Sequence, residues 1–216
     1  PPPLPPWMPP SRPPPLPSVP PKPPGHPPSP PCTYPQVGTD ITEADTAYDG
    51  EHFGTSVQIS RDGRILAISS TMGGQFKVQR YEYVGFDWVA QGAPIVEEVA
   101  GSDVLPQGQS QAQVSLAATG NRIAVAANLH DGGKGHVRVF DWDGSSWGAA
   151  AFDFTGLSAG DQLGMSVALS DNGQRVAMGA LTTDQRGRVE VWDISTGTAS
   201  QLGTSFVLGD TIARSM

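Results

Sequence analysis

Hydrophobic and polar positions alternate with a period of two in three similar segments of the chain. Because successive side chains of a β-strand lie on opposite faces, this period predicts strands that bury one face. In each segment two such runs flank a dipeptide that tolerates positive φ, which predicts a two-residue hairpin turn. The segments are FGTSVQISRDGRILAISS (53–70), SQAQVSLAATGNRIAVAAN (110–128) and LGMSVALSDNGQRVAMGAL (163–181), and their turn dipeptides are Asp62-Gly63, Gly120-Asn121 and Asn172-Gly173.

Each hairpin is followed by two further strand-like runs, so that a whole unit repeats. A third run carries a valine and an aromatic residue at fixed places, and a weaker fourth run follows it. The equivalent residues are Val57, Val114 and Val167 in the first run; Val78, Val137 and Val189, then Tyr81, Phe140 and Trp192, in the third; and Trp88, Trp147 and Ser200 in the fourth. Four antiparallel strands per unit with a recurring aromatic residue are typical of propeller blades. We therefore predict an all-β fold without a long helix, in which the apolar columns form the core between neighbouring blades.

The repeats stop before a ring is complete. Blade units are expected at about 50–100, 101–155 and 156–203, and residues 204–216 start another, because 209–216 align with 160–167. Propellers typically have four to eight blades, and an exposed half-strand is an edge that natural proteins avoid. We expect a fragment of a larger repeat protein, or a neighbouring chain that completes the sheet. The lack of an initiator methionine and of a signal peptide fits a processed chain or a fragment.

The repeats resemble the FG-GAP type of β-propeller, of the kind found in integrin-like ectodomains and in many secreted proteins. The matching residues are Phe53-Gly54-Thr55-Ser56-Val57, Leu163-Gly164-Met165-Ser166-Val167 and Gly179-Ala180. Blades of this family often bind calcium through a loop of the DxDxDG kind, which is missing here. Asp131 and Asp184, in the corresponding glycine-rich loops, are lone acids that turn chemistry also explains. They are weak calcium candidates, and no other cofactor is expected.

Proline is concentrated at one end of the chain. Residues 1–35 hold 20 of the 22 prolines, and residues 1–36 carry two bases and no acid, whereas the rest is acidic and glycine-rich. Proline fixes φ and donates no backbone hydrogen bond, so polyproline II is the regular form that remains. Three interpretations are open: a semi-rigid linker or disordered tail, a PxxP ligand for an aromatic groove, and a structural rod.

The same segment resembles the hydroxyproline-rich glycoproteins of algal and plant extracellular matrix, since single serines interrupt the proline blocks, as in PPSPP at 27–31. In that family prolines are hydroxylated and carry arabinose-rich chains, and serines can carry galactose. The resemblance favours an extended, glycan-coated rod over residues 1–36, with the repeats at 37–216. The candidate hydroxylation and glycosylation sites are Pro2, Pro3, Pro6, Pro10, Pro14, Pro15, Pro21, Pro24, Pro28, Pro31, Ser11, Ser18 and Ser29. The single cysteine, Cys32, lies between rod and repeats and is a candidate for an inter-chain disulfide.

Composition argues against several other classes of protein. The net charge is −8 without a Lys/Arg-rich patch, so nucleic acid is not an expected partner, and no apolar run is long enough to span a membrane. His130 and His136 flank one loop beside Asp131, but this trio lacks a further metal ligand. Trp142, flanked by acids, suits a sugar contact, although the equivalent Trp192-Asp193 indicates a place in the blade architecture. We find neither a phosphate-binding loop nor a nucleophile paired with a base, and we expect no enzyme.

The sequence as a whole indicates an extracellular structural glycoprotein. An O-glycosylated rod and a propeller head would assemble into a cell-surface filament, such as a flagellar hair, or into a cell-wall layer. The expected partners are copies of itself or other matrix glycoproteins, together with covalently attached glycans. Two alternatives stay open: an adhesive propeller that binds a glycan or a protein, and, as a lesser one, a propeller-fold glycosidase or lyase.

Overall fold

The structure, a computed structural model, describes residues 36–42, 52–72, 75–98, 113–181 and 186–207. The chain divides into two compact units, Pro1–Gln36 and Val37–Met216. Residues 1–35 of the predicted rod, with all its candidate hydroxylation and glycosylation sites and Cys32, lie outside the described residues. Every described strand belongs to the second unit.

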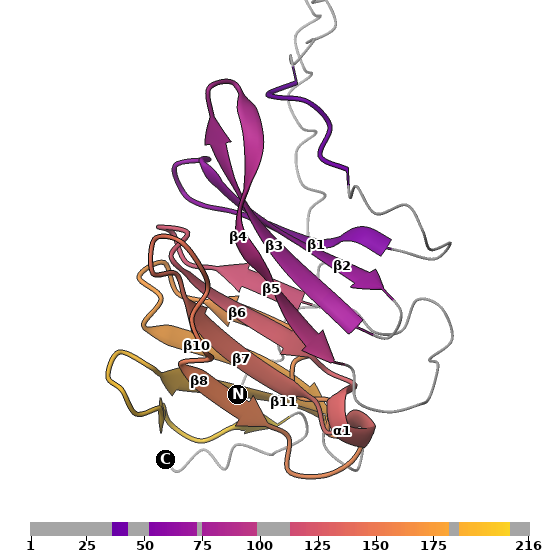
Figure 1. Cartoon of the computed structure of the whole chain (residues 1–216). Coiled ribbons are helices and arrows are strands. Elements are labelled where there is room, and N and C mark those ends of the chain that lie inside the picture. Colours follow the sequence, from indigo (N-terminus) through magenta and orange to yellow (C-terminus); the bar gives the residue numbers. More distant parts are fainter. Residues whose placement is uncertain (1–35, 43–51, 73–74, 99–112, 182–185, 208–216) are drawn as a thin grey trace, which may run out of the picture. The chain divides into compact units, whose positions relative to one another are not determined.

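The second unit is built from three antiparallel sheets, as the period-two pattern predicted (Figure 1). In each sheet the strands pair in chain order, except that the last strand of the third sheet pairs with the strand two before it. Blade 1 contains β1 (His52–Ile59), β2 (Ile65–Met72), β3 (Gln75–Val84) and β4 (Asp87–Glu98); blade 2 contains β5 (Gln113–Leu116), β6 (Arg122–Ala127), β7 (His136–Asp141) and β8 (Phe152–Thr155); blade 3 contains β9 (Ser166–Leu169), β10 (Arg175–Leu181), β11 (Gly187–Asp193), β12 (Ser200–Gln201) and β13 (Phe206–Val207). The all-β fold of propeller-type blades is thereby confirmed. Between β6 and β7 lies one short helical turn, α1 (His130–Gly133).

The hairpin turns are longer than predicted. In blade 3 the backbone N–H of Ser170 donates to the carbonyl of Arg175 at 3.0 Å, and that of Gly173 donates back to Ser170 at 2.8 Å. Four residues therefore separate the paired positions, and positive φ occurs only at the third of these four. This position is Gly63, Gly120 or Gly173, with φ of 73°, 74° and 68°. The prediction of two-residue turns was wrong, and in blade 2 its alignment was displaced, since Gly120 rather than Asn121 matches Gly63.

The fourth strands also differ from the prediction. Trp88 does lie at the start of β4, directly after its first residue, but Trp147 lies ahead of β8 in an isolated bridge with Trp142. In blade 3 the fourth strand is split, because β12 pairs with one end of β11 and β13 with the other. Val207 therefore still belongs to the third sheet, beyond the boundary expected at 203. Of the unit expected at 204–216, residues 208–216 lie outside the described part.

The core lies between the blades, as predicted. Alternate residues of β6 face opposite ways: Ile123 and Val125 contact blade 1, whereas Ala124 and Ala126 contact blade 3. The first core contains Ile65, Ala67, Phe76, Val78, Ile95, Val114, Leu116, Ile123, Val125, Ala127 and Phe140; the second contains Ala124, Ala126, Val137, Val139, Leu163, Val176, Met178, Ala180 and Ile194. Blade 2 is buried on both faces, and over the described residues the blades form a row rather than a closed ring.

Candidate functional site

The first turn of each blade contacts the equivalent turn of the next. The backbone N–H of Arg61 donates to the carbonyl of Ala118 at 3.0 Å, and the N–H of Ala118 donates to the carbonyl of Asp171 at 2.9 Å. Arg61, Ala118 and Asp171 hold the same place in their turns, so one bond is repeated at both junctions. Among the described residues no acceptor meets the N–H of Asp171. This series of backbone bonds therefore has an open donor at blade 3.

A second repeated contact begins at the first residue of the second strand. In blade 2 this residue is Arg122, whose guanidinium binds both oxygens of Asp141 and donates to the carbonyl of Gly173 in blade 3 at 2.9 Å. A further contact to the carbonyl of Ile194 is 3.4 Å long. Hydrogen bonding to Asp141 raises the pKa of Arg122. In blade 1 the equivalent Ile65 packs on the turn glycine of blade 2 instead. At both junctions, the first residue of the second strand thus contacts the turn glycine of the following blade.

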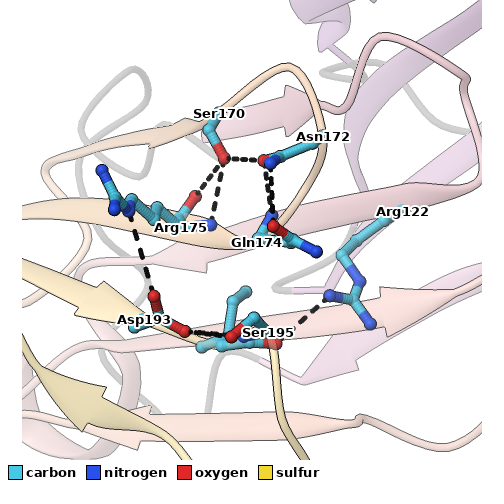
Figure 2. A network of polar contacts seen from close by, with 8 residues as sticks. Arg122, Ser170, Asn172, Gln174, Arg175, Asp193 and Ser195 are labelled. Carbon is cyan, nitrogen blue, oxygen red and sulfur yellow. Dashed lines mark hydrogen bonds and ion pairs between the residues drawn. The ribbon is translucent and has the colours of Figure 1, made fainter.

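Blade 3 carries the same pair, and the described residues include no blade after it. Arg175 and Asp193 are equivalent to Arg122 and Asp141, and their closest atoms are 3.9 Å apart, with 63% of the Arg175 side chain exposed (Figure 2). Figure 2 also shows the turn beside them, in which Ser170 and Asn172 bind one another and the backbone of the turn. A hydrogen bond from Ser195 lowers the pKa of Asp193. The arginine of blade 3 is therefore placed as in blade 2, but within the described part of the chain it contacts no neighbouring blade.

Apolar residues of the repeat are exposed at both ends of the row. We call the side of a blade that faces the preceding blade its leading face, and the opposite side its trailing face. Equivalent residues are buried inside the row and exposed at its ends: Val57 50% against Val114 3%, Ile59 55% against Leu116 9%, and Val189 42% against Val137 0%. Phe206, the partner of Val189 in the sheet, is 68% exposed. The leading face of blade 1 and the trailing face of blade 3 are thus built like blade junctions.

A buried polar cluster lies between blades 1 and 2. Glu97, near the end of β4, is 4% exposed and accepts a hydrogen bond from Arg138 of β7 at 2.9 Å. Arg138 also binds Asp153 of β8 at 2.8 Å. His136 is 1% exposed, stacks on His130 at 4.1 Å and holds its Nε2 3.6 Å from Glu97. The cluster joins two blades through a carboxylate that is removed from water.

Burial sets the protonation of this cluster. It raises the pKa of Glu97, against the lowering effect of Arg138. It also lowers the pKa of His136 to about 4, with the positive charges of His130 and Arg138 acting in the same direction. The imidazole of His136 is therefore neutral near pH 7, and its contact with Glu97 is not an ion pair there. Both groups are closed to solvent, so the cluster stabilises the junction and offers no access for a substrate.

The described residues that the sequence suggested for metal or sugar binding make contacts within the fold. The Asp131 carboxylate binds Lys134 Nζ at 2.6 Å, which lowers its pKa, and Asp184 lies outside the described residues. Within the described ranges no group of three or more His, Cys, Asp or Glu side chains is arranged to hold a metal ion. Arg80 of blade 1 lies 4.4 Å over the ring of Trp142, so this ring packs at the junction of blades 1 and 2. The residue equivalent to Trp142 in blade 3 is Ile194 rather than Trp192, because Asp141 and Asp193 hold the same place. Asp143 caps its own loop through Ser145 and Ser146, which lowers its pKa to about 2.

The residues that follow the proline-rich unit are fastened to blade 1. Asp87 accepts hydrogen bonds from the backbone N–H and the hydroxyl of Thr39, each at 3.0 Å. Trp88 Nε1 donates to the carbonyl of Val37 at 3.3 Å. The hydrogen bond from the backbone N–H of Thr39 is the largest cause of the lowered pKa of Asp87. The entry into the blades is thus held at the outer hairpin of blade 1.

Sequence reasoning missed Glu97, Arg138 and Arg122. One signal was available for Glu97, because it lies two residues after Ile95 and therefore on the same, buried face of the strand. A carboxylate in that place requires a buried cation or donor. For Arg122 the repeat alignment itself was the signal, since Arg175 and an acid on the paired strand recur one unit later.

Several solved structures resemble the chain in fold, whereas no family model and no curated protein matches it. The Dos1 propeller shares 12% identity at a TM-score of 0.41, over 71% of this chain and 36% of that one. TolB from Acinetobacter baumannii shares 16% at 0.41, over 72% and 33%. A candidate 6-phosphogluconolactonase from Bacteroides uniformis shares 13% at 0.46, over 68% and 39%. The chain thus spans less than two thirds of each of these structures, and the FG-GAP resemblance stays a prediction. No helix in the described part of the chain has the length and apolar character to cross a membrane.

Proposed function

We propose that this protein is an extracellular structural glycoprotein whose blades act as assembly elements. The observation that carries the proposal is the exposure of repeat-core residues at both ends of the row, seen at Val57 and Val189. The equivalent side chains are buried at the inner junctions, so the exposed ones lack the surface that covers their equivalents. Exposed apolar patches mark interaction sites.

The proline-rich segment supports the same proposal from the sequence. Twenty prolines within residues 1–35 exclude a packed core there and favour an extended form. In a hydroxyproline-rich glycoprotein this segment would be a glycan-coated rod that spaces the heads in a filament or wall layer. The expected partners are copies of the chain and other matrix glycoproteins, outside the cell.

Mass spectrometry on residues 1–36 of the protein from its native source tests this function. The proposal predicts hydroxylated prolines and attached sugars at several of the candidate positions, such as Pro14, Pro15 and Ser18. A bacterially expressed chain is the control for the unmodified mass. An unmodified native segment would contradict the glycoprotein proposal.

A further inference from the structure

We infer that the trailing face of blade 3 binds the leading face of blade 1 in a second copy of this chain. The inference rests on the proposed function, because it names the partner that covers the two exposed faces. The contact is head-to-tail, so the two surfaces that meet are different.

The apolar surfaces of the two faces are complementary because the chain already contains two junctions of the same kind. At the junction of blades 2 and 3, Val137 on the trailing face and Val167 on the leading face share one core. The equivalent residues at the ends of the row are Val189 and Val57, both about half exposed. Bringing these faces together would bury the same columns again and add a third junction to the row.

Polar groups at the two ends match in the same way. Arg122 donates to the carbonyl of Gly173 and contacts that of Ile194 across the inner junction. The residues of blade 1 equivalent to these two are Gly63 and Tyr83, and the donor equivalent to Arg122 is Arg175. In the proposed contact Arg175 therefore meets the carbonyls of Gly63 and Tyr83 of the second copy. A charged donor on buried carbonyls is among the stronger hydrogen bonds.

A backbone N–H group and the glycines of the leading faces also fit the proposed contact. The open N–H of Asp171 takes the carbonyl of Arg61 of the second copy, which would extend the bond repeated at both inner junctions. Gly164 packs so closely on blade 2 that a Cβ there would lie 2.9 Å from the Cβ of Ala126. The equivalent Gly54 of blade 1 has φ of 82° and nothing within 4 Å of such a Cβ. Blade 1 thus keeps the open glycine of a leading face without a neighbour to approach it.

Symmetry sets the expected size of the assembly. A head-to-tail contact closes a ring when its rotation allows, and otherwise grows into an open filament. The described residues of two chains contain six blades, within the four to eight that close a propeller. We therefore expect a dimer with two identical junctions.

Sedimentation equilibrium of the full 216-residue chain under reducing conditions tests this inference. The reductant removes any dimer that is linked through Cys32. The expected mass is about twice 22.6 kDa, and a monomer at all concentrations up to about 100 μM, well above typical transient affinities, would overturn the inference. Larger open polymers would contradict the closed dimer.

Two charge substitutions and a matched control identify the faces. Val189→Glu on the trailing face and Ile59→Glu on the leading face should each weaken association at least about tenfold, because the junction would bury a carboxylate. Leu157→Glu, at an 80% exposed residue of the connection between blades 2 and 3, should leave association unchanged. Circular dichroism on all three variants verifies that they fold.

Mixing the two variants tests the head-to-tail arrangement itself. Val189→Glu leaves an intact leading face, and Ile59→Glu leaves an intact trailing face, so the mixture regains one unperturbed junction. Partial recovery of the dimer on mixing supports the inference, whereas no recovery indicates a contact between like faces and overturns it. Modification of residues 1–36 is measured separately, so failure here and failure of the glycoprotein proposal are distinguishable.

Discussion

The Arg122 contact offers the sharpest test of how the blades are held together, because the repeat supplies its own control. Arg122 binds Asp141 in its own blade and Gly173 in the next, and 24% of its side chain is exposed. Arg175 holds the equivalent place in blade 3, with 63% of its side chain exposed and the nearest carboxylate 3.9 Å away. One substitution, arginine to alanine, can therefore be made with and without a following blade.

The structure allows the cost of each substitution to be estimated. Arg122→Ala removes a charged hydrogen bond to a partly buried carbonyl, which typically stabilises by about 1.5–3 kcal/mol. Asp141 stays about half exposed and remains solvated, so a loss of about 2 kcal/mol is expected for the whole change. Arg175→Ala removes only an exposed ion pair, worth at most about 0.5 kcal/mol. In a protein of this size the first change should lower Tm by about 4–8 °C.

Chemical unfolding followed by circular dichroism measures both values. The chain is kept dilute and reduced, so that association does not add to the stability of either form. Equal losses for the two variants, or a loss below about 0.5 kcal/mol for Arg122→Ala, would refute the role of Arg122 as a tie between blades. Asp141→Asn, which keeps the size of the partner, is expected to give an intermediate loss.

Two further predictions concern the junctions. Because burial lowers the pKa of His136 from 6.5 to about 4, the unfolded chain binds a proton before the folded chain does as the pH falls. Stability should therefore decline between about pH 6.5 and 4, by roughly 3 kcal/mol from this group, and His136→Gln should remove that part in unfolding curves measured across this range. Gly164→Ala should destabilise by at least about 2 kcal/mol more than Gly54→Ala, since both residues have positive φ but only the first meets Ala126; equal losses in denaturant titration would show that blade 3 is not closely packed there.

The fold could be predicted from the local hydrophobic pattern, whereas features that depend on contacts outside that pattern could not. Val114 and Val137 could be placed in a core from period and repeat alone, because each strand reads as alternating and each unit repeats. The turn lengths could not be read in this way, since Ser60 and Ser170 bind the turn backbone with their hydroxyls and widen the loop. Trp147 was mistaken for a strand marker, because it forms a local bridge with Trp142 and packs against the first core without belonging to β8.

The candidate site depended still more on contacts distant in the sequence. Glu97 and Arg138 come from different blades, and no local motif joins them. The exposure of Val57 and Val189 follows from the positions of their blades at the ends of the row, and their own sequence surroundings resemble those of the buried equivalents. Sequence alone therefore identified the repeating unit, whereas the structure was needed to show which faces lack a neighbour.

The dependence of unfolding on chain concentration tests most directly whether the two exposed blade faces serve assembly. The thermal midpoint of the reduced full chain is measured over about two decades of concentration, because assembly adds stability by mass action. We predict a midpoint that rises with concentration and loses this dependence in Val189→Glu, where 42% of the substituted residue is exposed in the single chain. A midpoint that is independent of concentration in the unsubstituted chain would contradict the account.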